Sequence, residues 1–571
     1  MLINTDQELT QLVKQMIESP VIVLDTETTG LNPYLGDRLI GISILIPSTE
    51  ATYYLPFRHN IGPNLPIHCL KKLAPCFADP SKVMIGFNIK FDVHILEADG
   101  LPVFNRTVDV MLGSHLNNEN ELSFALKRLG TKYIDSEAGA QERQLLSDLN
   151  NNKSAMLNLS PDMVAPYAEQ DVILTWKLAQ FMNINLTKQN LSKLWSEVNE
   201  YCAAVTHMEH TGVLIDKYRC VHNAEHAQTQ IDKLYQDMVK IVGHDFNPNS
   251  VPQLREILNS KLTDKNALTK CTSPVALILL NYRGWFKAMS TYYNGFLDTM
   301  DCNQRIHPNL NMHGTVSGRL SCTSPNLQAL PKGKDQYRVR ELVIAPPKHV
   351  LFSFDWSQVE LRLLAHYTKE PFLQDVFKNN KDIHQETAKK LNMPRDLAKR
   401  INFGIVYGMG AEHLSESAGL DIDAAKKYLD EYHSMLPGVR KLYQSAEQIA
   451  IRNRYIPMWT GRLRHYRPED ETHKAMSNLI QGGVAEMMRM AITRLDKMLM
   501  GSQVRMNLQV HDEILFEVPE KEAVQWADPI KKVMENFKFS VPIIAAGAYG
   551  SDWSNMQDFD YDLTGYPIMR S

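Results

Sequence analysis

The sequence lacks any apolar run that approaches the roughly 18–20 residues needed to cross a bilayer. Its first residues, MLINTDQELT, contain no arginine and no apolar core, so we expect neither a signal nor a transit peptide. The seven cysteines form no C-x2-C pair, and the spacing of His68, Cys69 and Cys76 fits no common zinc site. We therefore expect reduced, buried thiols in an intracellular protein with no membrane partner.

An excess of positive charge is also missing, since 61 Lys and Arg residues face 65 Asp and Glu residues. Bulk charge alone does not suggest nucleic-acid binding. An acidic metal site can offset a basic cleft, however, so function must be sought in local patterns. The 571 residues are enough for about three or four domains with substantial cores.

The expected secondary structure divides the chain into two parts. Residues 1–195 contain short apolar runs separated by helical patterns, which is typical of an α/β domain, with strands at Val21–Leu24, Leu39–Ile46 and Val83–Phe87. A long helical pattern follows and is broken at Gly243. Strands then return and bracket a helical block; the strands are Val350–Phe354 and Gln509–Val518, and the block runs from Pro371 to Ala450. This order predicts a second, α+β part whose helical block projects from a sheet.

Carboxylates recur in three short motifs of the first part. The motifs are D-x-E at Asp25 and Glu27, N-x2-F-D at Asn88 and Asp92, and Y-x3-D at Tyr167 and Asp171. Taken singly, each has a structural explanation: an acidic strand end, an asparagine cap on a helix, and a half-buried tyrosine beside a solvated aspartate. Taken together, the four carboxylates are enough to hold two Mg²⁺ or Mn²⁺ ions, which prefer oxygen ligands.

The order of these motifs resembles the proofreading 3′→5′ exonuclease family, which has a ribonuclease-H-like fold. The resemblance includes neighbouring residues: Thr28, Gly30 and Leu31 after the first motif, and Asp109, Met111 and Leu112 before the third. It implies an active exonuclease domain in which Tyr167 orients the attacking water. The implied catalytic set is Asp25, Glu27, Asp92, Tyr167 and Asp171.

The second part carries a longer series of motifs. They are T-V-S-G-R-L-S at 315–321, P-N-L-Q at 325–328, F-D-W-S-Q-V-E-L-R at 354–362, R-x3-K-x3-F-G-x2-Y-G at 395–408 and Q-V-H-D-E at 509–513. Asp355 ends an expected strand and Asp512 lies at the tight turn of an expected hairpin, so the two carboxylates can share two Mg²⁺ ions.

A stripe of basic and aromatic residues marks the fourth motif. Arg395, Lys399, Phe403 and Tyr407 recur every four residues and lie on one helix face. The basic end suits a triphosphate, and the aromatic end suits a base pair. Gly404 and Gly408 cost a helix ~1 kcal/mol each, which the close approach of a nucleotide would justify.

This series resembles the family A DNA polymerases, the group that contains the large fragment of bacterial DNA polymerase I and many phage replicases. The resemblance implies two Mg²⁺ ions per active site, replaceable by Mn²⁺, and primer-template DNA and dNTPs as partners. The implied polymerase catalytic residues are Asp355, Asp512, Glu513 and Lys399, with Lys399 donating a proton to the leaving pyrophosphate. The implied nucleotide site is Gln358, Glu360, His384, Arg395, Lys399, Phe403 and Tyr407, and the implied DNA contacts are Arg319, Asn326, Gln328, Gln481 and His511.

The two resemblances together imply a ribonuclease-H-like exonuclease domain at 1–195 and a right-hand polymerase at 196–571. The thumb is expected at about 196–310, the palm at about 311–370 and 466–571, and the fingers at about 371–465. Three positions depart from the family pattern, namely Gly333 where a basic residue is usual, Ser477 where Asn is usual and Trp356 where Tyr is common.

The first exonuclease motif lies near the start of the sequence, and the thumb is compact. We therefore expect a monomeric phage or viral replicative polymerase in the host cytoplasm, with a helicase, single-strand-binding protein or processivity protein as candidate partners. The alternative is a bacterial repair-type polymerase that lacks the 5′-nuclease domain. Two complete metal clusters argue against a DNA-binding or purely structural second half, and Glu360 argues against an RNA polymerase.

Overall fold

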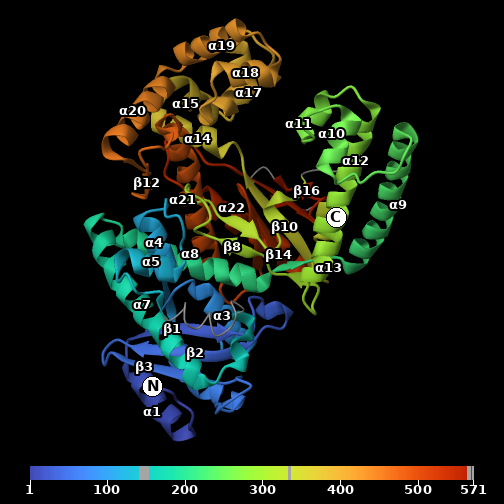
Figure 1. The fold of residues 1–571 in the computed structure, drawn as a ribbon. Coiled ribbons are helices and arrows are strands. Elements are labelled where there is room, and N and C mark those ends of the chain that lie inside the picture. The colour runs from blue at the N-terminus through green and yellow to red at the C-terminus, as the bar shows by residue number, and fades with distance from the viewer. Residues whose placement is uncertain (141–152, 332–335, 562–566, 569–571) are drawn as a thin grey trace.

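The computed structural model describes residues 1–140, 153–331, 336–561 and 567–568 (Figure 1). Gly333, one of the departures from the family pattern, lies outside the described residues. Within these ranges, no helix is both long enough and apolar enough to cross a membrane. The seven cysteines are free thiols, and all but Cys271 and Cys302 are buried, as expected.

A mixed sheet forms the core of the N-terminal part. Among the described residues it has the order β3-β2-β1-β4-β5, in which β1 runs antiparallel to β2 and parallel to β4. Its strands are β1 Val21–Thr28, β2 Leu39–Ile46, β3 Ala51–Pro56, β4 Val83–Gly86 and β5 Arg106–Asp109. The surrounding helices are α1 Asp6–Glu18, α2 Ala74–Phe77, α3 Ile89–Ala98, α4 Val110–Asn117, α5 Leu126–Tyr133 and α7 Pro161–Lys188. The three predicted strands are confirmed, because their apolar runs fill this core.

One long helix, α8 Ser192–Thr211, connects the two parts. It packs against β5, α3 and α4 of the N-terminal part, and also against β13 and α21 of the C-terminal part. Beyond it, α9 Lys217–Val242 ends at Gly243, which adopts a left-handed φ of 86° as a helix C-cap, so the predicted helix end is confirmed.

The helices after α8 form a projection in which α9 lies beside α12 (Figure 1). Its other elements are α10 Val251–Leu258, α11 Lys265–Lys270, α12 Pro274–Lys287, a π-helical segment Ala288–Asn294 and α13 Gly295–Thr299. Short strand pairs lead back toward the C-terminal part: β6 Val213–Leu214 with β7 Arg305–Ile306, and β8 Asn309–Asn311 with β9 Ser321–Thr323.

A second sheet forms the core of the C-terminal part. Its order among the described residues is β13-β14-β10-β15-β16, with antiparallel pairing throughout. The strands are β10 His349–Trp356, β13 Arg505–Val510, β14 Glu513–Pro519, β15 Ala545–Gly550 and β16 Gln557–Asp558. Helices α14 Val359–Thr368, α21 Ala475–Leu499 and α22 Ala523–Glu535 belong to the same part, and β17 Asp560–Tyr561 pairs with β18 Pro567–Ile568.

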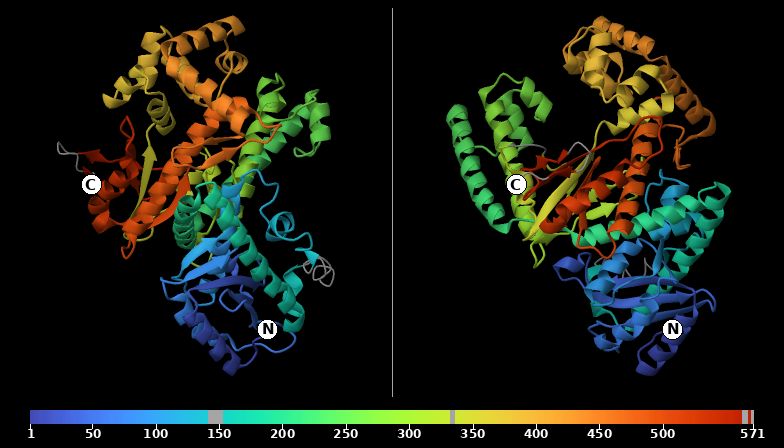
Figure 2. Two further views of the ribbon diagram at one scale, coloured as in Figure 1. Left: turned by 90° about the vertical axis from the view of Figure 1, so that its left-hand side faces the viewer. Right: turned by 180° about the vertical axis from the view of Figure 1, so that it is seen from behind.

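The predicted helical block is confirmed between β10 and β13. It comprises α15 Pro371–Lys378, α16 Ile383–Lys390, α17 Arg395–Val406, α18 Ala411–Ala418, α19 Ile422–Met435 and α20 Pro437–Asn453. A hairpin of β11 Tyr455–Pro457 and β12 Leu463–His465 then leads to α21. Figures 1 and 2 show the helical block and the α9–α12 projection rising on two sides of the second sheet, with the N-terminal part on the opposite side.

A buried glutamate on α21 is neutralised by two arginines. Glu486, only 1% exposed, accepts hydrogen bonds from Arg462 Nη1 at 2.9 Å and from Arg489 Nε and Nη2 at 3.1 and 2.9 Å. Burial would raise the pKa of Glu486, but the two guanidinium groups outweigh burial and lower the pKa.

Replacing Glu486 with glutamine is expected to lower the free energy of unfolding by ~3–5 kcal/mol at neutral pH, because the buried Arg462 loses its paired carboxylate and Arg489 keeps only its pair with Glu197. Folding lowers the pKa of Glu486 from its ordinary value of 4.5. The stabilisation is therefore present above the unfolded pKa and is lost as the pH falls through the folded pKa. Urea denaturation of both proteins across this range measures it, and a gap between them that does not narrow in acid would contradict the role of the charge.

Candidate functional site

The first carboxylate cluster forms at β1. Oxygens of Asp25, Glu27 and Asp171 lie within 4.8 Å of one another. Asp92, at 2% exposed, is fixed to the same strand, since its Oδ1 accepts hydrogen bonds from Thr26 N at 3.0 Å and Thr26 Oγ1 at 2.7 Å. Burial and then the negative charge of Asp25 raise the pKa of Asp92. The three motifs are thus brought together by the sheet and by the helices that flank it.

The third motif lies on α7, where Tyr167 and Asp171 are one turn apart and both buried. The alternative interpretation of a solvated aspartate is therefore wrong. Lys127 of α5 forms an ion pair with Asp171, and its Nζ lies 4.8 Å from the centre of the Tyr167 ring. Lys127 is not among the residues predicted from the sequence, and its one local signal is that Lys127, Arg128 and Lys132 are basic residues of one short helix.

A cleft of about 1070 Å³ opens beside this cluster. The carboxylates line one part of it, and the α5 side chains Lys127, Arg128 and Lys132 line another. Acidic and basic groups in one cleft explain why bulk charge does not reveal the site. The cluster offers only oxygen ligands, which is the chemistry that hard divalent cations prefer.

Asn88 does not cap α3 with its side chain, so the alternative explanation of this motif as an asparagine side-chain cap is wrong. It takes a left-handed φ of 59° and makes no side-chain cap. Asp109, 1% exposed, instead accepts hydrogen bonds from the amides of Asn88 and Ile89, both at 3.1 Å, and from Met111 at 2.8 Å. This one carboxylate fixes the first turns of α3 and α4, which places Asp92 beside β1.

The second carboxylate site lies at one end of the second sheet. Asp355 on β10 pairs in register with Glu513 on β14, and Trp356 N donates a hydrogen bond to Asp512 O at 3.2 Å. Asp512 lies in the turn between β13 and β14, so the predicted hairpin is confirmed. Asp355 is exposed and Asp512 is half-buried. These two carboxylates offer the oxygen chemistry that Mg²⁺ prefers.

Glu513 differs from its two acidic neighbours because it is buried and held by protein groups. Ser353 Oγ donates to it at 2.5 Å and Trp553 Nε1 at 2.8 Å, and Arg340 Nη1 lies 3.8 Å away. Its geometry favours supporting the strand ends over holding a cation. Trp356, where tyrosine is common, is also buried and donates its Nε1–H to Met534 O at 2.9 Å.

The stripe of the fourth motif lies on α17 as far as Phe403, and Tyr407 follows directly after the helix ends. Arg395 Nε and Nη2 donate to Asp382 Oδ2 at 2.9 and 2.8 Å. The rings of His384 and Phe403 lie 5.3 Å apart, and Lys399 is exposed. The structure thus brings the predicted phosphate and base contacts to one side of the helical block.

The two glycines of this motif differ in what the local chain requires. Gly408 has a φ of +71°, a left-handed conformation that favours glycine without any nucleotide. A Cβ on Gly404 would lie 2.1 Å from Met409 Cε, which is the flexible end of a side chain, so the nucleotide-based explanation of Gly404 stays a prediction.

Glu360 connects two further predicted groups. It is 6% exposed, and its Oε1 accepts hydrogen bonds from Arg319 Nη2 at 2.7 Å and Tyr407 Oη at 3.3 Å. Burial, followed by the charge of Glu360, raises the pKa of Tyr407 to about 12. A predicted DNA contact and two predicted nucleotide contacts therefore form one cluster.

The remaining predicted residues lie near the same end of the second sheet. Gln328 Nε2 donates to Gln509 O at 2.9 Å, and Asn326 Oδ1 accepts from Gln328 N at 3.1 Å. Gln358 directly precedes α14, and His511 is exposed in the turn beside Asp512. Ser477, where asparagine is usual, accepts a hydrogen bond from Gln481 Nε2 at 3.0 Å.

Comparisons with known proteins find a match for both parts of the chain. The model of "DNA polymerase family A" matches residues 218–555, and that of "3′-5′ exonuclease" matches residues 1–187. The chain is 29% identical to DNA polymerase I of Chloroflexus aurantiacus, over 96% of this chain and 62% of that one. It is 28% identical to DNA polymerase I of Borreliella burgdorferi, over 97% and 64% of the two chains. The chain thus spans less than two thirds of these relatives' length.

A solved structure with the same fold is the POL domain of Pol1 from M. smegmatis in complex with DNA primer-template and dNTP. Its TM-score is 0.83 at 22% identity, over 97% of this chain and 99% of that one. An exonuclease domain with a mixed sheet, followed by a polymerase fold, is the architecture that the sequence predicts.

This chain belongs to DNA polymerase family A and carries a 3′→5′ exonuclease domain. Its reported relatives are bacterial DNA polymerases I, so the expectation of a phage or viral replicase has no support and the bacterial alternative is favoured. The domain boundaries at 195/196 and within the polymerase part stay predictions, as do the roles of individual site residues.

Proposed function

We propose that this chain is a DNA-directed DNA polymerase of the bacterial polymerase I type, which extends primers from dNTPs and removes mispaired ends by 3′→5′ excision. The observation that carries the proposal is the presence of two separate carboxylate sites on two different sheets, each inside the segment that matches the corresponding family model. Primer-template DNA and dNTPs are the proposed partners, in a cytoplasmic, monomeric enzyme.

In the exonuclease cleft, Asp25, Glu27, Asp92 and Asp171 would hold two Mg²⁺ ions, which supply an activated water and stabilise the leaving 3′-oxygen. The buried Tyr167 hydroxyl would orient that water. Lys127, Arg128 and Lys132 line the same cleft and would contact the phosphates of the strand being trimmed.

In the polymerase site, Asp355 and Asp512 would hold the Mg²⁺ ions that serve the primer 3′-oxygen and the triphosphate. Arg395 and His384 would contact the outer phosphates, and Lys399 would donate a proton to pyrophosphate. Gln358 and Glu360 would line the sugar pocket. Arg319, Asn326, Gln328, Gln481 and His511 would contact the DNA near the primer end.

A primer-extension assay with each dNTP alone tests the proposal most directly. The wild-type protein should add the templated nucleotide and should shorten an unextended primer, whereas Asp25→Ala should add the nucleotide without shortening the primer. Addition that ignores the template, or that prefers ribonucleotides, would contradict the proposed function.

Phe403→Tyr is expected to relax discrimination against dideoxynucleotides by about tenfold to a hundredfold. A tyrosine hydroxyl can replace part of the hydrogen bonding of the missing 3′-hydroxyl, and such a bond in a dry site is worth ~1–3 kcal/mol.

Glu360→Ala should admit ribonucleotides, because the buried Glu360 stem would meet the 2′-hydroxyl. Competition between the nucleotides in single-nucleotide extension measures both ratios.

The matched control is Phe372→Tyr, which adds the same hydroxyl to another half-buried aromatic ring of the helical block. Its selectivity should equal that of the wild type. An unchanged dideoxy ratio in Phe403→Tyr would mean that α17 is not the nucleotide-binding helix.

A further inference from the structure

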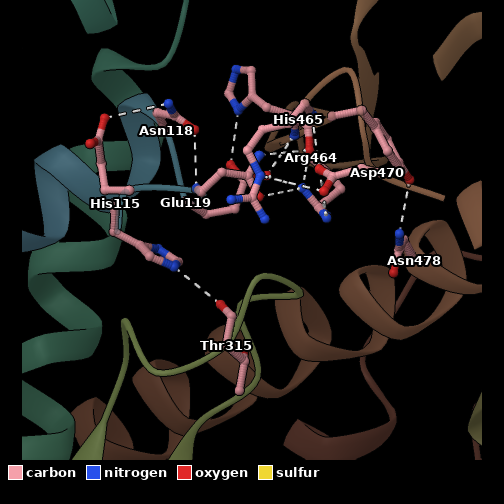
Figure 3. Close-up of polar contacts among 12 residues, drawn as sticks. His115, Asn118, Glu119, Thr315, Arg464, His465, Asp470 and Asn478 are labelled. Atoms are coloured by element: carbon pink, nitrogen blue, oxygen red, sulfur yellow. Dashed lines mark hydrogen bonds and ion pairs between the residues drawn. The ribbon is translucent and has the colours of Figure 1, made fainter. Parts of the chain in front are cut away.

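A short segment of the exonuclease domain, residues 115–121, is bonded on one side to the polymerase part (Figure 3). On the other side it is bonded to Lys132, which lines the exonuclease cleft. We call it the joint segment. It begins in the last turns of α4 and continues into the loop before α5. None of its residues belongs to either carboxylate site.

Both ring nitrogens of His115 form hydrogen bonds with residues of the polymerase part. This buried side chain donates from Nε2 to Thr315 O at 3.1 Å, and its Nδ1 accepts from Arg462 Nη2 at 3.1 Å. Burial, then the positive charge of Arg462, lowers the pKa of His115, which agrees with a neutral ring in this tautomer. Figure 3 shows the ring directed at Thr315, the first residue of the T-V-S-G-R motif.

Further contacts lead from the region of Thr315 to residues of the proposed nucleotide site. Gly318 lies directly against Arg462, since a Cβ at Gly318 would be 2.8 Å from the guanidinium carbon. The next residue, Arg319, donates to Glu360, which also accepts from Tyr407. A continuous series of polar and packing contacts therefore leads from α4 to the sugar pocket.

Glu119 fixes the hairpin that carries Arg462. At 6% exposed, it accepts from Arg464 Nη1 at 2.9 Å, from His465 N at 2.6 Å and from His465 Nδ1 at 2.8 Å. Asn120 adds two bonds, from its Nδ2 to His465 O and from Arg464 Nη1 to its Oδ1, both at 3.0 Å. This hairpin follows the helical block and precedes α21, so the exonuclease domain holds the connection between them.

On its other side, the joint segment positions the ammonium group of Lys132 in the exonuclease cleft. Asn118 Nδ2 donates to Glu121 Oε1 at 3.4 Å. Lys132 Nζ donates to the two carboxylate oxygens of Glu121 at 2.7 and 2.8 Å, and Tyr133 Oη donates to the same group. Lys132 lines the cleft. The seven residues of the joint segment therefore fix the position of the Lys132 ammonium group relative to the T-V-S-G-R motif.

We propose that the joint segment sets how a primer 3′ end is divided between extension and excision, with His115 and Glu119 as positioning residues. The inference rests on the proposed function. His115 and the Glu119-bound hairpin hold the Thr315–Arg319 loop against the primer end. Loosening them weakens that hold, whereas the bonds from Glu121 to Lys132 keep the exonuclease cleft intact. The primer end is then excised more often.

Glu119→Gln tests this with little change in shape, and Asn120→Ala tests it with the Glu119 carboxylate retained. The readout is idle turnover on a paired primer with the next templated dNTP, expressed as nucleotide released per nucleotide incorporated. We expect this ratio to rise about fivefold, the lower end of typical coupling between sites. Excision of single-stranded DNA, which needs no transfer of the end, should stay within about twofold, as should extension in an Asp25→Ala background.

Glu200→Gln is the matched control, because it removes one carboxylate from an exposed pair with Lys497 between α8 and α21. Its turnover ratio should equal that of the wild type. An unchanged or lowered ratio in folded Asn120→Ala would overturn the proposal, as would an equal rise in the control or a parallel loss of single-strand excision. If Glu119→Gln fails to fold by circular dichroism, Asn120→Ala decides alone. Loss of both activities in the wild type would instead contradict the proposed function.

Discussion

Replacing Asp355 or Asp512 with asparagine is expected to slow primer extension by several orders of magnitude while DNA binding survives. Asparagine keeps the size of the side chain but loses the charge that holds divalent cations. Phosphoryl transfer depends mainly on positioning and on stabilisation of charge, so this loss falls on the chemical step. Asp355 lies at the end of β10 and Asp512 in the adjacent hairpin turn, and neither is one of the proposed DNA contacts.

Single-turnover nucleotide addition, together with an equilibrium DNA-binding measurement, separates the two effects. Asp558→Asn is the control, because it changes an exposed aspartate on the edge strand β16 of the same sheet. It should extend primers at the wild-type rate. A near-normal rate in Asp355→Asn or Asp512→Asn would rule out these residues as the metal ligands.

The double variant Asp25→Ala with Glu27→Ala is expected to abolish 3′→5′ degradation and to leave extension largely unchanged. Both side chains face the cleft beside β1, and removing them takes away two of the three carboxylates that lie within 4.8 Å of one another. The polymerase carboxylates lie on a different sheet, so their own geometry is not altered.

Degradation of a labelled primer without dNTPs, measured beside extension with dNTPs, gives both rates from one preparation. Glu18→Ala, an exposed change at the end of α1, should leave both rates unchanged. Loss of both activities in a double variant that remains folded would contradict the independence of the two sites.

The sequence predicts the acidic strand ends well because apolar runs and tight turns are local signals. The apolar runs Val21–Leu24 and Val350–Phe354 predict buried strands. The acidic residues that follow them can therefore be assigned to strand ends without any tertiary information. The stripe on α17 is predictable for the same reason, since a helix repeats every few residues.

Contacts between distant elements were not predictable in this way. Lys127 reaches Asp171 across 44 residues (171 − 127), and Glu119 reaches Arg464 across 345. A local pattern can show that these side chains are charged, but it cannot show which distant group each of them contacts. The left-handed turn at Gly408 was not predicted either, because a positive φ cannot be told from a glycine inside a helical pattern. Composition and motif spacing also did not predict that the chain is similar to bacterial DNA polymerases I.

Helix α8 restricts how the two parts of the chain can move relative to each other. Its buried residues, among them Trp195, Tyr201 and Met208, pack into the same apolar core as both sheets. Two bodies that share a core helix cannot rotate freely about a hinge, since rotation would open that core to water. The two carboxylate sites are therefore held at a fixed separation, and under the proposed function a mispaired primer end would have to unwind and move from one site to the other.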